Sequence, residues 1–245
     1  MKAKEPSIYV GTSGWHYRHW IGTFYPAGYK PPLFMDYYLK FFNTVEINNS
    51  FYKLPLLETF DLWRKSVPKD FLFVVKASRF ITHNKKLLDP ETSFTKFWTN
   101  VVALKDKLGI ILFQLPPTWK VNHERFETFL KALPKRHRYV FEFRNPTWYE
   151  DAIYKLMEKY NIGFCIYELN GHLSPEVVTA DFVYVRLHGP GAKYQGSYDD
   201  AALQYWADKM NAWKKDGKDV FCFFDNDEQG FAAFNAIRIK ELLQE

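Results

Sequence analysis

The sequence predicts an α/β fold built as a single (β/α)8 TIM-like barrel domain over residues 1–245. Eight short apolar runs, bounded by Gly, Pro or Asn, recur with amphipathic helical patterns between them. No Gly/Ser/Pro-rich linker divides the chain, and 245 residues are a usual length for such a barrel. An open parallel sheet of seven or eight strands would give much the same alternation, so the pattern favours a barrel without establishing closure.

The expected strands consist of Val, Ile, Phe and Leu and turn polar at their C-terminal ends. They span residues 8–12, 44–48, 71–77, 110–115, 139–144, 163–167, 182–188 and 220–226. Helical periodicity predicts the connecting helices over residues 33–42, 57–67, 91–107, 124–133, 150–160, 199–215 and 230–243. Only the link over residues 170–180 is too short for a full helix.

The composition excludes several classes of protein. The 33 Lys and Arg against 28 Asp and Glu give a net charge of +5, which suits an anionic partner but falls short of a dedicated nucleic-acid binder. No apolar stretch approaches the roughly 20 residues of a membrane span, and the N-terminus lacks the apolar core of a secretory signal, so we expect a cytoplasmic protein. Cys165 and Cys222 lie in apolar runs, which predicts buried reduced thiols rather than a disulfide.

Charged and amide side chains gather where the expected strands end, which is where barrel enzymes carry their chemistry. Because residues two apart in a strand share a face, three same-face pairs follow, and three further polar residues end strands. The pairs are Glu46 with Asn48, Glu142 with Arg144 and Arg186 with His188, and the further residues are Lys76, Gln114 and Asn226. Parity directs Asp225 away from Asn226, so only Asn226 is counted.

Glu142 lies in an otherwise apolar strand and therefore needs a partner. It could form a buried ion pair with Lys76, Arg144 or Arg186 that only fills the barrel end. Buried ion pairs are weak stabilisers, which favours a functional role. We assign Glu46 and Glu142 as general acid–base residues and His188 as an acid or oxyanion donor.

The remaining candidates would bind the substrate. The cationic side chains of Lys76, Arg144 and Arg186 can hold an anion. The glycine-rich loop after residue 188 either offers backbone N–H groups to the same anion or is only a solvent-exposed loop. Aromatic residues after the strands would either stack on a sugar or base or form a hydrophobic lid. The substrate-binding candidates are Trp15, Asn48, Lys76, His83, Gln114, Arg144, Arg186, Gly189 and Asn226.

We predict no cofactor and assign no metal ligands. Two Glu and one His match a Mg²⁺ or Mn²⁺ site by ligand type only, and Lys76, Arg144 and Arg186 would repel a dication. A divalent metal is therefore the weaker alternative.

Seven ordered blocks give the chain a resemblance to a known family. They are residues 11–15, 45–48 with Phe51 and Tyr52, 73–77, 82–83, 114–117, 142–144 and 184–189. On these the sequence resembles the domain-of-unknown-function 72 family, also called the YecE-like family, over nearly its whole length. The resemblance implies a TIM-like barrel and no particular reaction. Glu168 stands where an Asp is commoner and Asp225 where an Asn is usual, and the sixth strand contributes no candidate.

We therefore expect an enzyme of hydrolase or lyase type that acts on a small anionic molecule at the C-terminal ends of the strands. A nucleic-acid processing or binding protein is one alternative, because the chain combines a basic excess with loop aromatics. A non-catalytic metabolite-binding protein is the other. The fold does not decide among them, because barrels support many chemistries.

Overall fold

A computed structural model describes residues 5–191 and 193–244. The chain divides into two compact units, neither of which is continuous in sequence. Unit 1 comprises the described parts of Met1–Val45, Ile166–Glu176 and Asp181–Glu245, and unit 2 comprises Glu46–Cys165 and Val177–Ala180. Two strands, β2 (Thr44–Ile47) and β6 (Gly163–Leu169), contribute residues to both units.

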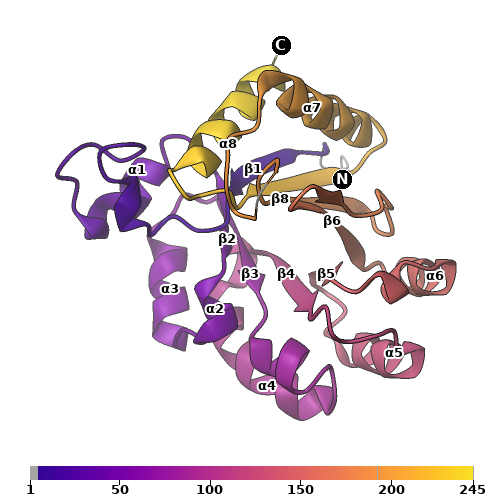
Figure 1. Ribbon diagram of the computed structural model, residues 1–245. Coiled ribbons are helices and arrows are strands. Elements are labelled where there is room, and N and C mark those ends of the chain that lie inside the picture. Colours follow the sequence, from indigo (N-terminus) through magenta and orange to yellow (C-terminus); the bar gives the residue numbers. More distant parts are fainter. Residues whose placement is uncertain (1–4, 192, 245) are drawn as a thin grey trace. The chain divides into compact units, whose positions relative to one another are not determined.

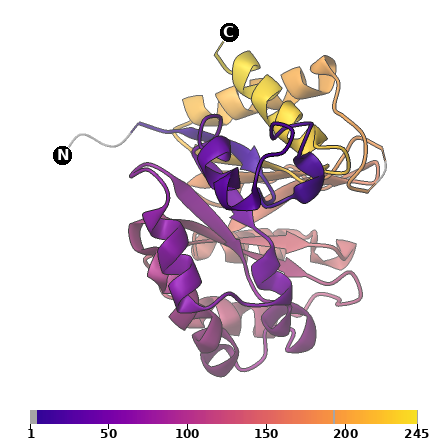
Figure 2. The same cartoon turned by 90° about the vertical axis from the view of Figure 1, so that its left-hand side faces the viewer.

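Unit 1 is a parallel sheet covered by two long helices. Strand β9 (Asp219–Phe224) pairs in parallel with β1 (Ile8–Thr12) and with β8 (Phe182–Leu187), and β7 (His172–Leu173) pairs antiparallel with the end of β6. Helix α7 (Asp200–Lys215) packs on β9, and α8 (Phe231–Leu242) packs on β1 and β9. The two helices lie side by side in both views (Figures 1 and 2). The short helices of unit 1 are η1 (Arg18–Trp20), η2 (Pro31–Leu33) and α1 (Phe34–Tyr38).

Unit 2 repeats the strand–helix alternation. Strands β3 (Leu72–Lys76), β4 (Leu108–Leu115) and β5 (Arg138–Phe143) pair in parallel, and β5 pairs with the start of β6. The long helices follow in chain order around these strands (Figure 1): α3 (Leu57–Lys65), α4 (Pro90–Val101), α5 (His123–Ala132) and α6 (Asp151–Lys159). The short helices are α2 (Asn49–Tyr52), the π-helix η3 (Phe80–Asn84), η4 (Val102–Lys107) and η5 (Pro146–Trp148).

Local chemistry explains where several helices begin. Asn122 accepts a hydrogen bond from the backbone N–H of Arg125 at the start of α5, and Asp199 does the same for Ala202 at the start of α7. The strands between the helices are apolar and almost wholly buried, as expected for parallel strands covered on both faces. Cys165 and Cys222 are free, buried thiols, as the sequence predicts.

All eight expected strands are present, whereas several connections differ from expectation. The expected helix over residues 33–42 is only η2 followed by α1, and the one over 91–107 breaks after Val101, where Lys105 adopts a positive φ of 52°. Helix α2 and η3 were not expected, because four or five residues carry too little periodicity. The link after β6 holds the short strand β7.

Candidate functional site

In unit 2, three predicted residues lie on one face of strands β3, β4 and β5, and a fourth contacts one of them. Register partners in parallel strands point the same way, and the structure pairs Gln114 with Glu142 and Lys76 with Leu112. Leu112 lies two residues before Gln114, so Lys76, Gln114 and Glu142 share a face. Arg144 joins them through its contact with Glu142. The structure thus brings Glu142 and Arg144 together, as strand alternation predicts, and puts Lys76 and Gln114 on the face of Glu142.

Glu142 and Arg144 form a buried ion pair at the end of β5. The guanidinium Nε of Arg144 donates to Oε1 of Glu142, and the two side chains are 8% and 0% exposed. The other carboxylate oxygen, Oε2, lies 3.8 Å from the Cys165 thiol on β6. Glu142 thus has the ion-pair partner that its burial requires. Arg144 is one of the three possible partners that the sequence offers for Glu142.

Lys76 and His83 lie against the same ring. The Lys76 ammonium stands 4.6 Å from the centre of the Phe51 ring, and the His83 ring packs edge-on against it at 5.0 Å. His83 is half-buried, and burial together with the charges of Lys76 and Arg79 lowers its pKa below the ordinary value. His83 is therefore neutral near pH 7.

Glu46 and Asn48 lie where β2 passes into α2. Glu46 is fully buried, but the strand ends at Ile47, and Asn48 already has helical backbone angles. Strand alternation therefore does not extend to Asn48, and the same-face argument for this pair does not hold.

In unit 1, Arg186 and His188 meet at an acidic residue. Oδ2 of Asp225 lies 3.1 Å from Nη2 of Arg186 and 2.9 Å from Nδ1 of His188. Nη1 of Arg186 is 3.3 Å from Nε2 of His188. Arg186 and His188 are 1% and 0% exposed and the Asp225 side chain is 14% exposed, so a buried guanidinium and imidazole meet a largely buried carboxylate at the ends of β8 and β9.

Asp225, which the parity argument does not count, contacts two of the predicted site residues. The register places Leu187 opposite Phe224, so His188 and Asp225 follow on the same face. Residues 219–224 of β9 are apolar or buried on both faces, and the sequence therefore contains no signal of which parity points toward Arg186.

Asn226, the predicted substrate-binding residue next to Asp225, forms hydrogen bonds that hold the loop between β8 and α7. Its amide nitrogen donates to the carbonyl of Gly196 at 2.8 Å and to Oδ1 of Asn235 at 2.9 Å. Its own Oδ1 is buried and has no hydrogen-bond partner among residues 5–191 and 193–244.

The loop after His188 is anchored by a tyrosine. Gly189, at a positive φ of 112°, donates its N–H to the Tyr198 hydroxyl at 3.0 Å. That hydroxyl also forms a hydrogen bond with the side chain of Glu168 on β6, a strand from which no site residue is predicted. Burial raises the pKa of Glu168 above the ordinary value. Glu168 is therefore a second half-buried carboxyl group near His188, whose backbone N–H donates to the Glu168 carbonyl at 3.0 Å.

A further carboxylate follows Asp225. Burial, and then the charge of Asp225, raises the pKa of Asp227 from 3.8 to about 6, while His19 opposes the rise. His19 Nε2 lies 2.7 Å from the Asp227 carbonyl and 3.6 Å from its carboxylate. Trp15, another predicted binding residue of this unit, is 8% exposed, and its carbonyl accepts from the Tyr25 hydroxyl.

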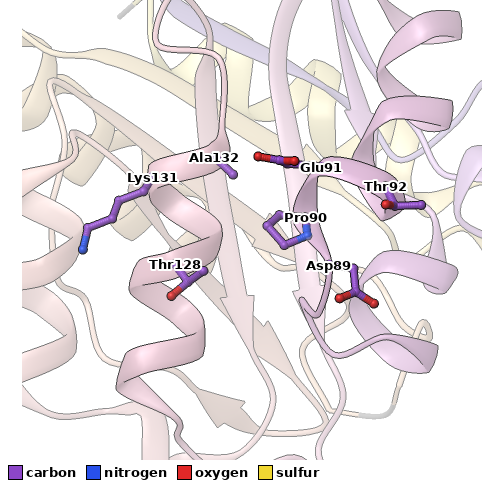
Figure 3. Close-up of a pocket in the computed structure, with 7 residues that line it drawn as sticks. All are labelled: Asp89, Pro90, Glu91, Thr92, Thr128, Lys131 and Ala132. Atoms are coloured by element: carbon purple, nitrogen blue, oxygen red, sulfur yellow. The ribbon is translucent and has the colours of Figure 1, made fainter.

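A separate hollow of about 510 Å³ lies on the helical side of unit 2 (Figure 3). It is open, and none of the predicted site residues lines it. Its walls are the start of α4 and the second half of α5: Asp89, Pro90, Glu91, Thr92, Thr128, Lys131 and Ala132. Across the described ranges, no three His, Cys, Asp or Glu side chains are grouped as metal ligands. Within those ranges, no helix has the length and apolar character to cross a membrane.

Known proteins resemble the chain, two of them over nearly its full length. The UPF0759 protein YunF of Bacillus subtilis is 27% identical over 96% of this chain and 94% of its own length. The UPF0759 protein YecE of Escherichia coli is 29% identical over 58% of this chain and 50% of its own length. A crystal structure of a DUF72 family protein from Thermotoga maritima superposes with a TM-score of 0.88 and 28% identity, covering 98% of this chain and all of that one.

These similarities agree with the strand–helix alternation and the parallel pairing of the strands, so the chain has the TIM-like α/β barrel fold. The family described as "Protein of unknown function DUF72" matches residues 9–245. The chain therefore belongs to the DUF72 family.

Proposed function

We propose that the chain is an enzyme that carries out acid–base chemistry, of hydrolase or lyase type, on a small anionic molecule. The observation that supports this is the buried group of Arg186, His188 and Asp225. A buried charged group is roughly neutral for stability when compared with apolar side chains that fill the same volume. A role in chemistry accounts better for three such side chains at the ends of β8 and β9.

Each member of this group has a role that follows from its contacts. The Asp225 carboxylate lies beside Nδ1 of His188 and favours the tautomer of His188 that carries its proton on Nδ1. Nε2 of His188 is then the proton acceptor. Arg186 lies beside that Nε2 and carries the positive charge that an anionic substrate requires. His188 would move the proton, Arg186 would bind the anion, and Asp225 would position the imidazole.

Residues of unit 2 enter the proposal as separate candidates. Glu142 and Glu46 are proposed general bases, since both are buried carboxyl groups at strand ends. The remaining proposed substrate contacts are Asn48, Lys76, His83, Gln114 and Arg144 in unit 2, and Trp15, Gly189 and Asn226 in unit 1. Each is tested by its own variant.

The first experiment identifies the ligand class. Thermal unfolding is measured with phosphate, sulfate, sugar phosphates, nucleotides, carboxylates and uncharged sugars at one ionic strength. A ligand present at about 100 times its Kd adds about 2.7 kcal/mol, which raises Tm by roughly 5 to 10 °C for a chain of this size. We expect one anionic class to raise Tm and the uncharged sugars to leave it unchanged.

The second experiment tests turnover of the compounds that bind. His188→Asn should lower kcat by about 100-fold or more while the ligand still raises Tm, because the variant removes the proton-transfer group and keeps a similar shape. Glu142→Gln tests the general base of unit 2 in the same way. Arg238→Gln is the control, because Arg238 forms an exposed ion pair with Asp200 on the surface of unit 1.

Three results would contradict the proposal. Full turnover in His188→Asn would remove the acid–base role. Binding without turnover by the wild type would favour a metabolite-binding protein. Binding of single-stranded nucleic acid that weakens steeply with salt, without small-molecule stabilisation, would favour the nucleic-acid alternative.

A further inference from the structure

Two basic side chains, those of Lys76 and His83, lie against one phenylalanine in unit 2. Lys76 ends β3, and Arg79 and His83 belong to the segment that follows it. The Phe51 ring contacts the Lys76 ammonium at 4.6 Å and the His83 ring at 5.0 Å, and Arg79 is close enough to act on the charge of His83. We call Phe51, Lys76, Arg79 and His83 the Phe51 cluster.

Hydrogen bonds fix this cluster to the sheet. The Ser50 hydroxyl, on α2, donates to the Lys76 carbonyl at 2.6 Å, which ties the helix carrying Phe51 to the end of β3. Oγ1 of Thr82 lies 2.9 Å from Nδ1 of His83, so this contact holds the imidazole through one of its two nitrogens. His83 itself belongs to the π-helix η3, a type of turn that often occurs at functional sites.

The two charges that shift the pKa of His83 are both positive. The groups that shift its pKa, besides burial, are the Lys76 ammonium and the Arg79 guanidinium, and both lower it. Lys76 is only 9% exposed, so solvent screens its charge weakly. An anion bound beside His83 would oppose the positive charges of Lys76 and Arg79 and would favour the protonated form of His83.

We infer that Lys76, Arg79 and His83 form a subsite for an oxyanion with two negative charges, the chemistry shared by a phosphate ester and a dicarboxylate. The lysine supplies a compact charge, the arginine a planar pair of donors and the histidine one ring N–H. Tyr52, 75% exposed beside Phe51, offers a ring on which the remainder of a ligand could stack. The inference rests on the proposed function in one respect, namely that this anion belongs to the substrate.

The test is a titration of His83 in the full chain, followed by NMR of the imidazole and assigned by the signal that His83→Asn removes. The probes are sulfate, phenyl phosphate and malonate, each compared with chloride at equal ionic strength. Sulfate comes first because it keeps its charge while histidine titrates. We expect the pKa of His83 to rise by about one unit at saturation, which corresponds to about tenfold tighter binding to the protonated form. A larger rise with phenyl phosphate than with malonate would identify the ester as the preferred ligand.

Two variants and a control localise the effect. Arg79→Gln changes an exposed side chain and Lys76→Met a buried one, and each should weaken sulfate binding about tenfold. Lys85→Gln is the matched control, because Lys85 lies on the same segment and pairs with Asp89. Sulfate binding in Lys85→Gln should equal that of the wild type.

The outcomes separate this inference from the proposed function. A His83 pKa that no anion moves, or wild-type sulfate binding in Arg79→Gln, would overturn the subsite even if the chain turns over a substrate. A response of His83 that depends on Lys76 and Arg79, in a chain without turnover, would support the subsite and contradict the enzyme.

Discussion

Asp225 holds two buried groups at once, and its removal should therefore affect stability as well as activity. Its carboxylate contacts Arg186, which is 1% exposed, and His188, which is fully buried. Breaking a buried ion pair leaves a charge without that partner in a weakly screened environment. We expect Asp225→Ala to lower the free energy of unfolding by about 3 kcal/mol in urea titrations.

The control for this prediction is a variant of an ion pair that is exposed to solvent. Asp200 and Arg238 are 68% and 36% exposed in their side chains, and Asp200→Asn should leave the unfolding midpoint unchanged. If Asp225→Ala proved as stable as Asp200→Asn, the carboxylate would not be supporting Arg186.

Asp227 should make stability depend on pH in an unusual direction. Its pKa is raised from 3.8 to about 6 in the folded chain by burial and by Asp225, so the folded state binds this proton more tightly than the unfolded state does. The resulting stabilisation is complete below about pH 4 and is lost as the pH rises through about 6. Because the side chain is 24% exposed, we expect a loss of only about 1 to 2 kcal/mol between pH 4 and pH 7.

The comparison is with Asp227→Asn, which cannot titrate at this position. Urea unfolding of both proteins from pH 4 to pH 7 should show the wild type losing stability relative to the variant as the pH rises. Parallel curves would mean that Asp227 titrates at its ordinary pKa.

Single residues show what the sequence could and could not predict about the site. Alternation along β5 correctly put Glu142 and Arg144 together, because two charges in an apolar strand mark their own face. The same rule gave no reason to choose Asp225, because both faces of β9 are buried and its register with β8 is not encoded locally. Glu168 was missed because its partners Tyr198 and Trp206 are distant in sequence.

Among the elements, the strands and long helices were predictable and the short turns were not. Strands such as β4 and β8 consist of unbroken apolar runs, which periodicity detects. Helix α2 and η3 are set instead by tertiary contacts, such as the bond from Ser50 to the Lys76 carbonyl. These two short helices carry Phe51 and His83 of the Phe51 cluster, whereas Lys76 ends the predictable strand β3.

The loop between β8 and α7 depends on one asparagine of α8. Oδ1 of Asn235 accepts from the Tyr198 N–H and from Asn226, while its Nδ2 donates to the Ser197 hydroxyl and the Tyr198 carbonyl. An aspartate cannot donate, so Asn235→Asp loses two of these four bonds and places a carboxylate against a carbonyl. We expect a loss of about 2 kcal/mol in the free energy of unfolding and faster hydrogen exchange in the loop.

Gln195→Glu provides the matched change from amide to acid in the same loop. Gln195 is exposed, and we expect its substitution to leave both the unfolding midpoint and the exchange rates unchanged. Equal effects of the two variants would indicate that added charge, rather than the lost bonds, disturbs the loop.

For the molecule as a whole, the sequence predicts one domain, and the division into units makes that prediction testable. Unit 1 is assembled from three chain segments and unit 2 from two, and β2 and β6 each supply residues to both. Neither unit can be released as a continuous piece of chain, and unfolding of either one removes residues from strands of the other. We therefore expect a single cooperative transition.

Buried tryptophans report on each unit separately. Trp20 in unit 1 and Trp148 in unit 2 are both fully buried, so fluorescence differences between wild type and Trp20→Phe or Trp148→Phe isolate the two signals. In urea, both signals and the far-UV circular dichroism should give one midpoint. Separate midpoints for Trp20 and Trp148 would show that the units unfold independently, and the chain would then behave as two domains rather than one.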